Sequence, residues 1–577
     1  MSALPHPIPD RHGTNLYDDD AELQALLPLY LPADLLAHLQ PHLQRLGGQA
    51  GGALDSLALT ADKHPPTLQH RSRTGLDTQR IDKHPAYVAL ERVAFADYGL
   101  AAMSHRAGVL GWHRPMPPAA KYALSYLLVQ AEFGLCCPLS MTDSLARTLR
   151  KFGDAALVER HLQTLITQDF DALGQGAMFM TEQAAGSDVA ATTTRAEPDG
   201  DHYRLQGDKW FCSNPDAALA MVLARIDGAP AGMAGVSLFL LPRTLADGSA
   251  NALRILRLKD KLGSRSMASG EIRLEGARAW LVGQAGRGFQ QMADMVNHSR
   301  LSNGMRAAGL MRRAFGEALH IARQRQAFGK PLIALPLMRR QLLKLLLPTE
   351  QARTLLLQAA EALRRADAGE PGAYALTRIL TPLIKFRACR DARRVTGDAM
   401  EVRGGCGYIE EWSDARLLRD AHLGSIWEGT SNIVALDVLR AIRRDAALPA
   451  LQQHLQALLA ATPLHPQARA VFDATLARVL ALASATAGAP PGSADASARQ
   501  VASALYHAAT AVAMAWEAGR TGSARRMRLA QTVLRLRLRP QDPLTVDEEP
   551  GWLAALLSPG THPDGTGREA VEDVICC

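Results

Sequence analysis

The spacing of apolar residues changes twice along this chain of 577 residues, and this restricts the fold more than any other feature. From His84 to about Gln168, apolar residues recur with a helical period. From about Gly174 the segments are short, partly alternating and bounded by Gly, Pro and Asp, which predicts antiparallel strands. From Gly288 long helical patterns return. This order predicts an α+β fold with helices and strands in separate layers, not alternating βαβ units.

The same changes predict four domains, because a chain of this length exceeds a single core. We expect an N-terminal arm and helical domain at 1–173, a β domain at 174–286, a helical bundle at 287–445, and an extra helical domain with a basic stripe and a tail at 446–577. In the arm, a helical pattern from Asp20 to Leu46 is followed by the Gly-rich run GGQAGG. No GxGxxG follows a predicted strand, which disfavours a Rossmann dinucleotide fold.

Composition narrows the class of protein. The seven cysteines include no CxxC, and the adjacent pairs Cys136–Cys137 and Cys576–Cys577 are poor candidates for disulfides or a metal site. The first residues lack the basic and apolar regions of a signal peptide, and no run of about 18 uncharged apolar residues occurs, so we expect a cytoplasmic protein without a membrane span. A net charge of +7 permits an anionic partner.

The segment from Ala399 to Ile433, AMEVRGGCGYIEEWSDARLLRDAHLGSIWEGTSNI, carries several chemically suggestive features. A glycine cluster that includes Gly404 and Gly405 forms a turn with little steric bulk, which a flat or phosphorylated group can approach closely. Glu428 stands between an indole and a glycine, and a carboxylate in apolar company has a raised pKa that suits proton removal near neutral pH. The alternative, a helix C-cap, a turn and an exposed Glu, is favoured by the residue types alone.

GGxGY, then RLLRD, then IWEGTSNI at this spacing resembles the C-terminal catalytic segment of the acyl-CoA dehydrogenase flavoproteins. The resemblance implies a helical domain, a β-barrel-like middle domain and a helical bundle, with FAD as cofactor and an acyl-CoA as substrate. It implies that Glu428 removes the substrate α-proton while a hydride passes to flavin N5. Ser299 occupies the alternative family position for the base, so Glu428 has no competitor. The other residues of the segment that would contact FAD are Gly404, Gly405, Thr430 and Asn432.

The stretch MTEQAAGSDV opens the strand-rich region. Gly186 and Ser187 offer a turn with a hydroxyl and free amides that can cradle flavin or phosphate oxygens. The alternative is an ordinary loop with an Asx turn at Asp188. The stretch resembles the MTExxxGSD signature of the same family, which implies that Met180, Thr181 and Ser187 contact FAD.

An aromatic residue stands two positions before a hydroxyl in the later stretch KWFCSN. On a strand, Phe211 and Ser213 share one face, so the ring can cover a flavin while the hydroxyl bonds to its N5 edge. The alternative is a strand with an apolar inward face. The family usually has Trp at the aromatic position, whereas Trp210 lies one place earlier here, which leaves open which ring packs on the flavin.

The run RQRQAFGKP is predicted to end a helix at Gly329, where basic residues suit the helix dipole. In the family, the corresponding Arg-x-x-Phe-Gly reaches the FAD of a neighbouring subunit, with the guanidinium on the diphosphate. The resemblance maps these roles to Arg325 and Phe328 and implies a homo-oligomer, in the family a homotetramer. Glu401 stands where many relatives have Gln, and a carboxylate is awkward beside a diphosphate.

The last predicted helix is basic, with seven Arg and no acid from Arg520 to Arg539. It begins with Ser523 as N-cap and stops before Pro540, and its apolar face would dock on the protein. An outward Arg stripe suits the phosphates of double-stranded DNA, whereas the alternatives are a solvated basic face or one paired with acids. The stripe residues are Arg525, Arg528, Arg535 and Arg539.

Runs such as PHPIPDRHGTNLYDDD, RLKDKLGSRS and SIWEGTSNI are together similar to the AidB branch of the family, bacterial flavoproteins of the adaptive response to DNA alkylation. The similarity extends to about Arg444 and weakens over 446–577, the part that binds DNA in the family. Two hypotheses follow. The protein is either an FAD-dependent dehydrogenase acting on the CH–CH group of an acyl-CoA or similar small substrate, or a DNA-binding protective flavoprotein with residual or no such activity.

Overall fold

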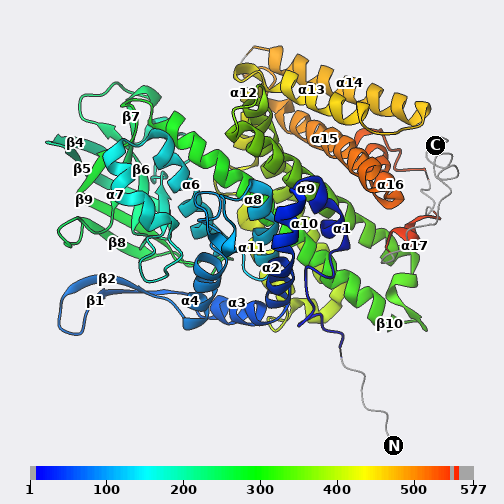
Figure 1. Cartoon of the computed structure of the whole chain (residues 1–577), viewed down its shortest axis with the longest axis horizontal. Coiled ribbons are helices and arrows are strands. Elements are labelled where there is room, and N and C mark those ends of the chain that lie inside the picture. The colour runs from blue at the N-terminus through cyan, green and yellow to red at the C-terminus, as the bar shows by residue number, and fades with distance from the viewer. Residues whose placement is uncertain (1–7, 491, 546–550, 558–577) are drawn as a thin grey trace, which may run out of the picture. The chain divides into compact units, whose positions relative to one another are not determined.

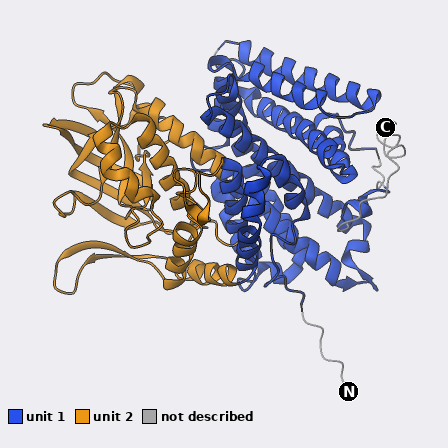
Figure 2. Cartoon of the chain, in the orientation of Figure 1, with its two compact units in different colours: residues 1–52, 118–130, 303–577 blue, residues 53–117, 131–302 orange. Residues whose placement is uncertain are grey.

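The computed structural model describes residues 8–490, 492–545 and 551–557, which divide into two units (Figure 2). The first unit contains residues 1–52, 118–130 and 303–577, as far as they are described, and the second contains residues 53–117 and 131–302. Both units are therefore discontinuous in sequence, whereas the four predicted domains are consecutive. Cys576 and Cys577 lie outside the described residues.

The second unit is built around a seven-stranded sheet (Figure 1). Its strands are β3 (Gly176–Phe179), β4 (Arg195–Asp199), β5 (His202–Ser213), β6 (Leu219–Ile226), β7 (Val236–Pro242), β8 (Leu253–Leu258) and β9 (Ser269–Leu281). The order is β3-β6-β4-β5-β9-β7, and β7 also pairs with β6, so five strands close into a ring. The pairs are antiparallel as expected, except that β3 and β4 run parallel to β6. This arrangement confirms the α+β class.

Alternating side chains of these strands fill the interior of the ring. Leu205, Phe239 and Ile272 are fully buried in one apolar cluster with residues from the other strands. Successive side chains of a strand point to opposite faces, so one side chain in two points inward. The neighbours of such residues on the strand lie on the opposite face, where Phe211 and Ser213 are found.

Helices and one hairpin complete the second unit. The elements are α3 (Ala53–Lys63), β1 (Thr67–Arg71), β2 (Asp77–Asp82), α4 (Pro85–Glu91), α6 (Cys136–Phe152), α7 (Ala155–Ile166) and the start of α8 (Gly288–Gln324). The β1–β2 hairpin lies in a stretch predicted to belong to a helical domain. Its side chains are mostly polar and exposed, so it leaves no alternating apolar pattern in the sequence.

The first unit is helical. It comprises α1 (Ala21–Leu26), α2 (Ala33–Gly51), α5 (Pro118–Leu128), the remainder of α8, α9 (Pro336–Asp367), α10 (Ala373–Arg403), α11 (Ser413–Gly424), α12 (Ser431–Arg444), α13 (Ala447–Ala460), α14 (Pro466–Gly488), α15 (Ala498–Thr521), α16 (Ala524–Val533) and α17 (Leu553–Leu556). Helix α10 packs on α9, α11 and α12, and α15 packs on α9, α12 and α14 (Figure 1).

Glycines in α2 let the N-terminal arm lie directly on that helix. A Cβ at Gly51 would lie 1.8 Å from the carbonyl oxygen of Thr14, and the Leu16 N–H donates to the Gly47 carbonyl at 3.0 Å. The predicted end of the helical pattern at Leu46 is wrong, because α2 continues to Gly51. The low helix propensity of glycine is offset by this close packing.

The basic helix begins and ends close to the predicted positions. The Ser523 hydroxyl accepts a hydrogen bond from the Arg526 N–H at 3.2 Å, which makes Ser523 the N-cap of α16. The helix continues through a π-helical turn, Leu534–Leu538, and stops before Pro540. The capping residue and the proline therefore give reliable limits for this element.

One helix among the described residues, α14, is long and apolar enough to cross a membrane by length and composition. A single such helix is weak evidence for a membrane span. In this structure α14 packs on α12 and α15.

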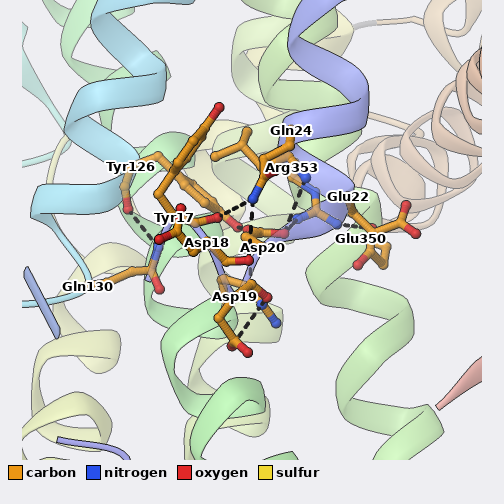
Figure 3. A network of polar contacts seen from close by, with 12 residues as sticks. Tyr17, Asp18, Asp19, Asp20, Glu22, Gln24, Tyr126, Gln130, Glu350 and Arg353 are labelled. Atoms are coloured by element: carbon orange, nitrogen blue, oxygen red, sulfur yellow. Dashed lines mark hydrogen bonds and ion pairs between the residues drawn. The ribbon is translucent and has the colours of Figure 1, made fainter. Parts of the chain in front are cut away.

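A network of buried charges links the N-terminal arm to helices that lie much later in the sequence (Figure 3). Asp20 forms ion pairs with Arg353 of α9 and with Arg312 of α8. Three residues earlier on α9, Glu350 pairs with Arg353 and with Arg526 of α16, at 2.9 Å from the latter. We call these five residues, together with Glu22 and Glu517, which also pair with Arg526, the ion network. Because each charge has an opposite charge beside it, burial is tolerated.

Candidate active site

Glu428 lies in the turn between α11 and α12, with its carboxylate held by a residue of α8. The Asn303 side-chain amide donates a hydrogen bond to Oε2 of Glu428. The Arg306 guanidinium stacks 4.7 Å from the centre of the neighbouring Trp427 ring. The surroundings of this carboxylate thus include polar groups as well as the predicted apolar neighbours.

The backbone of this turn is unusual, since Glu428 has a φ of 53°. A residue with a side chain rarely adopts this left-handed conformation, which costs roughly 1–3 kcal/mol and persists only where its surroundings fix it. Lys385 of α10 provides such fixation. Its ammonium donates to the carbonyls of Gly424, Trp427 and Gly429, at 2.7, 2.8 and 3.0 Å.

The sequence motifs do not predict Asn303 or Lys385. Lys385 has a recognisable signal, because it is the one charge in the apolar run ILTPLIKF, which predicts a buried and hydrogen-bonded lysine. Its side chain is 2% exposed. Asn303 has no comparable signal, since its partner lies 125 residues further along the chain.

The structure brings Arg325 to the glycine turn. The Arg325 Nη1 donates to the Arg403 carbonyl at 3.2 Å, and a Cβ at Gly404 would lie 3.5 Å from the same nitrogen. Gly404 has a φ of 74°, and no neighbouring atom lies within 4 Å of a Cβ built at Gly405. The Arg325 guanidinium therefore lies beside a glycine turn with free space around its backbone. Thr430 and Asn432, at the beginning of α12, are exposed.

The prediction that a helix ends at Gly329 is wrong. Helix α8 ends at Gln324 and is followed by a short hairpin, β10 (Gln326–Ala327) and β11 (Lys330–Pro331). Phe328 and Gly329 form its two-residue turn with φ values of 54° and 73°. Two successive positive φ values suit a type I′ hairpin turn and exclude an α-helix. The Phe328 side chain is 90% exposed.

In the second unit, the MTEQ stretch is fixed by its glutamate. Glu182 pairs with the buried Lys209 ammonium at 2.7 Å and also accepts hydrogen bonds from two threonine side chains. Burial opposes ionisation of Glu182, but Lys209 and these hydrogen bonds outweigh it and lower the pKa of the carboxyl to about 2. The carbonyl of Thr181 accepts from the Trp210 N–H at 2.8 Å, which ties this turn to β5.

The turn that follows contains the Asx arrangement considered as an alternative. The Asp188 Oδ1 accepts a hydrogen bond from the Ala190 N–H at 3.2 Å. Ser187 and Gly186 are nevertheless exposed, with no neighbouring atom within 4 Å of a Cβ built at Gly186. Met180, at the end of β3, is half-buried.

Phe211 is the ring on the same face of β5 as Ser213. Cys212 between them points into the apolar cluster, and the Phe211 side chain is 61% exposed. The Lys259 ammonium lies 3.5 Å from the centre of the Trp210 ring and 4.9 Å from that of Phe211. The pairing with β9 shifts register between the buried residues Lys209 and Cys212, so simple alternation is interrupted at Trp210 and Phe211, and both rings contact the Lys259 ammonium.

Arginines gather where α10, α15 and the π-helical turn after α16 lie close together in the first unit. We call them the basic cluster: Arg387, Arg390, Arg393, Arg394, Arg499 and Arg537. Burial and the charges of Arg499, Arg387 and Arg393 lower the pKa of Arg390. One acid, Asp391, pairs with Arg387 at 2.8 Å. Asp391 also lies 3.9 Å from Arg394, so one carboxylate serves two arginines of the cluster.

The four arginines of the predicted Arg stripe differ in their contacts. Arg525 pairs with Glu22 at 2.6 Å and also donates to the Leu556 carbonyl, so the paired alternative holds at this position. Arg528, Arg535 and Arg539 are half-buried. The last two lie at the same end of the helix as Arg537 of the basic cluster.

Three family models match successive parts of the chain. The model of the adaptive response protein AidB N-terminal domain matches residues 8–172, that of the acyl-CoA dehydrogenase middle domain residues 177–277, and that of the acyl-CoA dehydrogenase C-terminal domain residues 286–443. The putative acyl-CoA dehydrogenase AidB of Escherichia coli is 38% identical over 418 residues, which is 70% of this chain and 74% of that protein.

Solved structures show the same fold over most of the chain. ACDH-11 of Caenorhabditis elegans, solved in complex with C11-CoA, is 27% identical with a TM-score of 0.87, and the match covers 94% of each chain. Bd2924, solved in its apo form, is 32% identical with a TM-score of 0.81, over 89% of this chain and 100% of that one.

Proposed function

Because the chain belongs to the acyl-CoA dehydrogenase family and is AidB-like, we propose that it oxidises the Cα–Cβ bond of an acyl-CoA, with FAD as cofactor and Glu428 as base. The observation that carries the proposal is the Glu428 turn, in which the Asn303 amide holds the carboxylate and the Lys385 ammonium holds the backbone. The C11-CoA bound by ACDH-11 supports an acyl-CoA as substrate.

The residues assigned to FAD have chemistry that suits it. An exposed Phe211 beside the Ser213 hydroxyl suits a flat ring with a hydrogen-bonding edge. Arg325 next to Gly404 suits a diphosphate, because a guanidinium pairs with phosphate oxygens and glycine leaves room for them. Bound FAD supplies the acceptor for the hydride that leaves the substrate β-carbon.

Glu428 removes the α-proton of the thioester. The Asn303 amide donates to Oε2 of this carboxylate and fixes its direction. The α-proton becomes acidic only when the thioester carbonyl is polarised, and the backbone N–H of Glu428 is the donor that the family resemblance assigns to this oxygen. Proton removal and carbonyl polarisation thus come from one residue.

An anaerobic titration tests the proposal. Purified protein with bound FAD is mixed with acyl-CoAs of increasing chain length, including C11-CoA, and the flavin absorbance is followed. We expect one range of chain lengths to bleach the flavin band. Binding of acyl-CoAs without bleaching at any chain length would overturn the dehydrogenase proposal.

We propose association with double-stranded DNA as a second function, because the basic cluster favours a polyanionic partner. Within it, Arg394 and Arg499 are exposed on two different helices, and Arg535 and Arg539 follow along the adjacent turn. Arginines that repel one another are stabilised by phosphate groups between them, and the release of counterions makes such binding salt-dependent.

The test compares variants on this surface. Arg394→Ala combined with Arg499→Ala should weaken binding to a DNA duplex and reduce the slope of log affinity against log salt by about 0.9 for each phosphate that the variant no longer neutralises. Fluorescence anisotropy at several salt concentrations measures both. Arg478→Ala, which removes an exposed arginine of α14, should leave the slope unchanged. Equal slopes for all proteins would exclude the cluster as the DNA-binding surface.

A further inference from the structure

The Lys385 ammonium has three N–H donors, and three carbonyls of the Glu428 turn accept from it. Gly424 ends α11, where the helix dipole concentrates negative partial charge, and this favours a cation. Trp427 and Gly429 flank Glu428 on either side. The lysine therefore saturates its hydrogen bonds on the backbone of one short turn, although its own side chain lies almost completely buried on α10.

The direction of one of these bonds has a chemical consequence. The carbonyl of Trp427 and the N–H of Glu428 belong to the same planar peptide group, and in a trans peptide they point in opposite directions. A carbonyl directed at the Lys385 ammonium therefore directs the Glu428 N–H away from it. A positive charge on the carbonyl oxygen also draws electron density from the amide, which strengthens the N–H as a donor.

The same contacts fix the conformation of the base. One ammonium binds the carbonyl of the peptide group before Glu428 and that of the peptide group after Gly429, so the backbone is held on both sides of the Glu428–Gly429 step. This explains how a residue with a side chain keeps a φ of 53° without glycine at its position.

Resting on the proposed function, we propose that Lys385 is a positioning residue that orients and polarises the peptide group between Trp427 and Glu428, so that the Glu428 N–H stabilises the negative charge developing on the thioester oxygen. Lys385 itself touches neither substrate nor cofactor in this role. It acts through the backbone, whereas Asn303 acts through the side chain of Glu428.

The test measures carbonyl polarisation in the absence of turnover. Glu428→Gln supplies a protein that binds acyl-CoA without removing the α-proton, and a 13C-labelled thioester carbonyl reports its polarity by infrared absorption. The carbonyl stretch should move to lower frequency on binding to Glu428→Gln. In the double variant with Lys385→Met, most of this shift should disappear while the acyl-CoA still binds. Lys344→Met, an exposed lysine on α9, should leave the shift unchanged.

In the protein with Glu428 intact, Lys385→Met should slow flavin reduction by about 100-fold or more, the usual loss for one oxyanion donor, with little change in acyl-CoA affinity. Lys385→Gln keeps a hydrogen-bond donor without the charge, and its rate of flavin reduction should lie between those of Lys385→Met and the unaltered protein. An unchanged carbonyl shift in the double variant would overturn the proposal. So would loss of bound FAD from both lysine variants, because the role would then be structural.

The two proposals fail separately. If no acyl-CoA reduces the flavin of the unaltered protein, the dehydrogenase proposal fails, yet the infrared shift needs binding alone and still reports on Lys385. If reduction is normal and the shift does not depend on Lys385, the dehydrogenase proposal stands without this lysine.

Discussion

The carboxylate of Glu428 receives an amide hydrogen bond from Asn303, and its backbone is held in a left-handed conformation by Lys385. Gln at this position keeps the size and one accepting oxygen but cannot take a proton. Glu428→Gln should therefore retain FAD and lose reduction by acyl-CoA by at least about 100-fold, since a general base contributes 10²- to 10⁴-fold. Stopped-flow absorbance under anaerobic conditions measures the rate.

Glu411→Gln provides the matched control, because Glu411 is an exposed carboxylate in the same segment. Acyl-CoA should reduce the flavin of Glu411→Gln at the same rate as that of the unaltered protein. If Glu428→Gln reduced equally fast, another group would have to remove the α-proton.

For single residues, short motifs predict those whose roles depend on their neighbours in sequence. Trp-Glu-Gly-Thr indicates Glu428, but it contains nothing about Asn303 or Lys385, which come from two other helices. Their contacts exist only after α8 and α10 have packed beside the turn. A lone lysine in an apolar run indicates that it has partners, and the fold alone decides which carbonyls these are.

Two histidines join the helices after residue 446 to α9. The ring of His454 on α13 bonds to Gln358 at 2.9 Å, and that of His507 on α15 bonds to Gln351 at 3.0 Å. Burial, with a smaller contribution from a nearby arginine, lowers the pKa of His454 to about 4. Burial likewise holds the pKa of His507 well below its usual value. Both rings are therefore neutral in the folded protein near pH 7.

These shifts predict acid sensitivity of the contact between α13 and α9. Between pH 6.5 and about 4, the unfolded chain binds a proton at His454 that the folded chain does not, so stability falls as pH falls through this window. From pH 6.5 to pH 5 we expect a loss on the order of 1 kcal/mol from this residue. Urea unfolding at both pH values measures the loss. His454→Gln should reduce it, and a variant of the exposed His113 should not.

Element boundaries follow the sequence where a local signal exists. Ser523 and Pro540 mark the limits of the basic helix because capping and the missing proline N–H act locally. The hairpin turn at Phe328–Gly329 lacks the Asn-Gly or Asp-Gly pair that signals such turns, and β1–β2 lacks an apolar face. In both hairpins, tertiary surroundings override weak local preferences.

The ion network joins segments of the first unit that are far apart in sequence, and Figure 3 shows the part of it around Asp20, Glu350 and Arg353. Arg526 is 1% exposed and contacts the carboxylates of Glu517, Glu350 and Glu22. Burial acts against the charged guanidinium, but these carboxylates outweigh it and raise the pKa of Arg526. Removing the arginine would take its cation from the buried Glu517 and leave Glu350 and Glu22 with one arginine each among their described ion pairs.

Arg526→Met should therefore destabilise the protein by about 3–5 kcal/mol, the usual cost of removing one partner from a buried ion pair. Thermal or urea unfolding measures the change. Arg528→Met, two positions later and half-buried, should cost much less. Adding Glu517→Gln to Arg526→Met should restore part of the stability, and the absence of any recovery would argue against charge burial as the cause.

Sequence alone predicts the fold class, because the change between helical and alternating patterns is visible over long stretches. It does not predict which charges pair across the molecule. The sequence shows Asp20 as an acid in a polar arm and Arg526 as one arginine of a basic helix, and no local pattern connects either to α9. The sequence also does not predict the division into two discontinuous units, because this division depends on contacts between segments far apart in sequence.

The ion network also limits when, during synthesis of the chain, the N-terminal arm can form its ion pairs. Arg526, the partner of Glu22, is synthesised 504 residues after it. At 5–20 residues per second, this interval lasts about 25–100 s. Throughout it Glu22 lacks a cation that has not yet been synthesised, so the N-terminal arm completes its ion pairs only after α16 has been made.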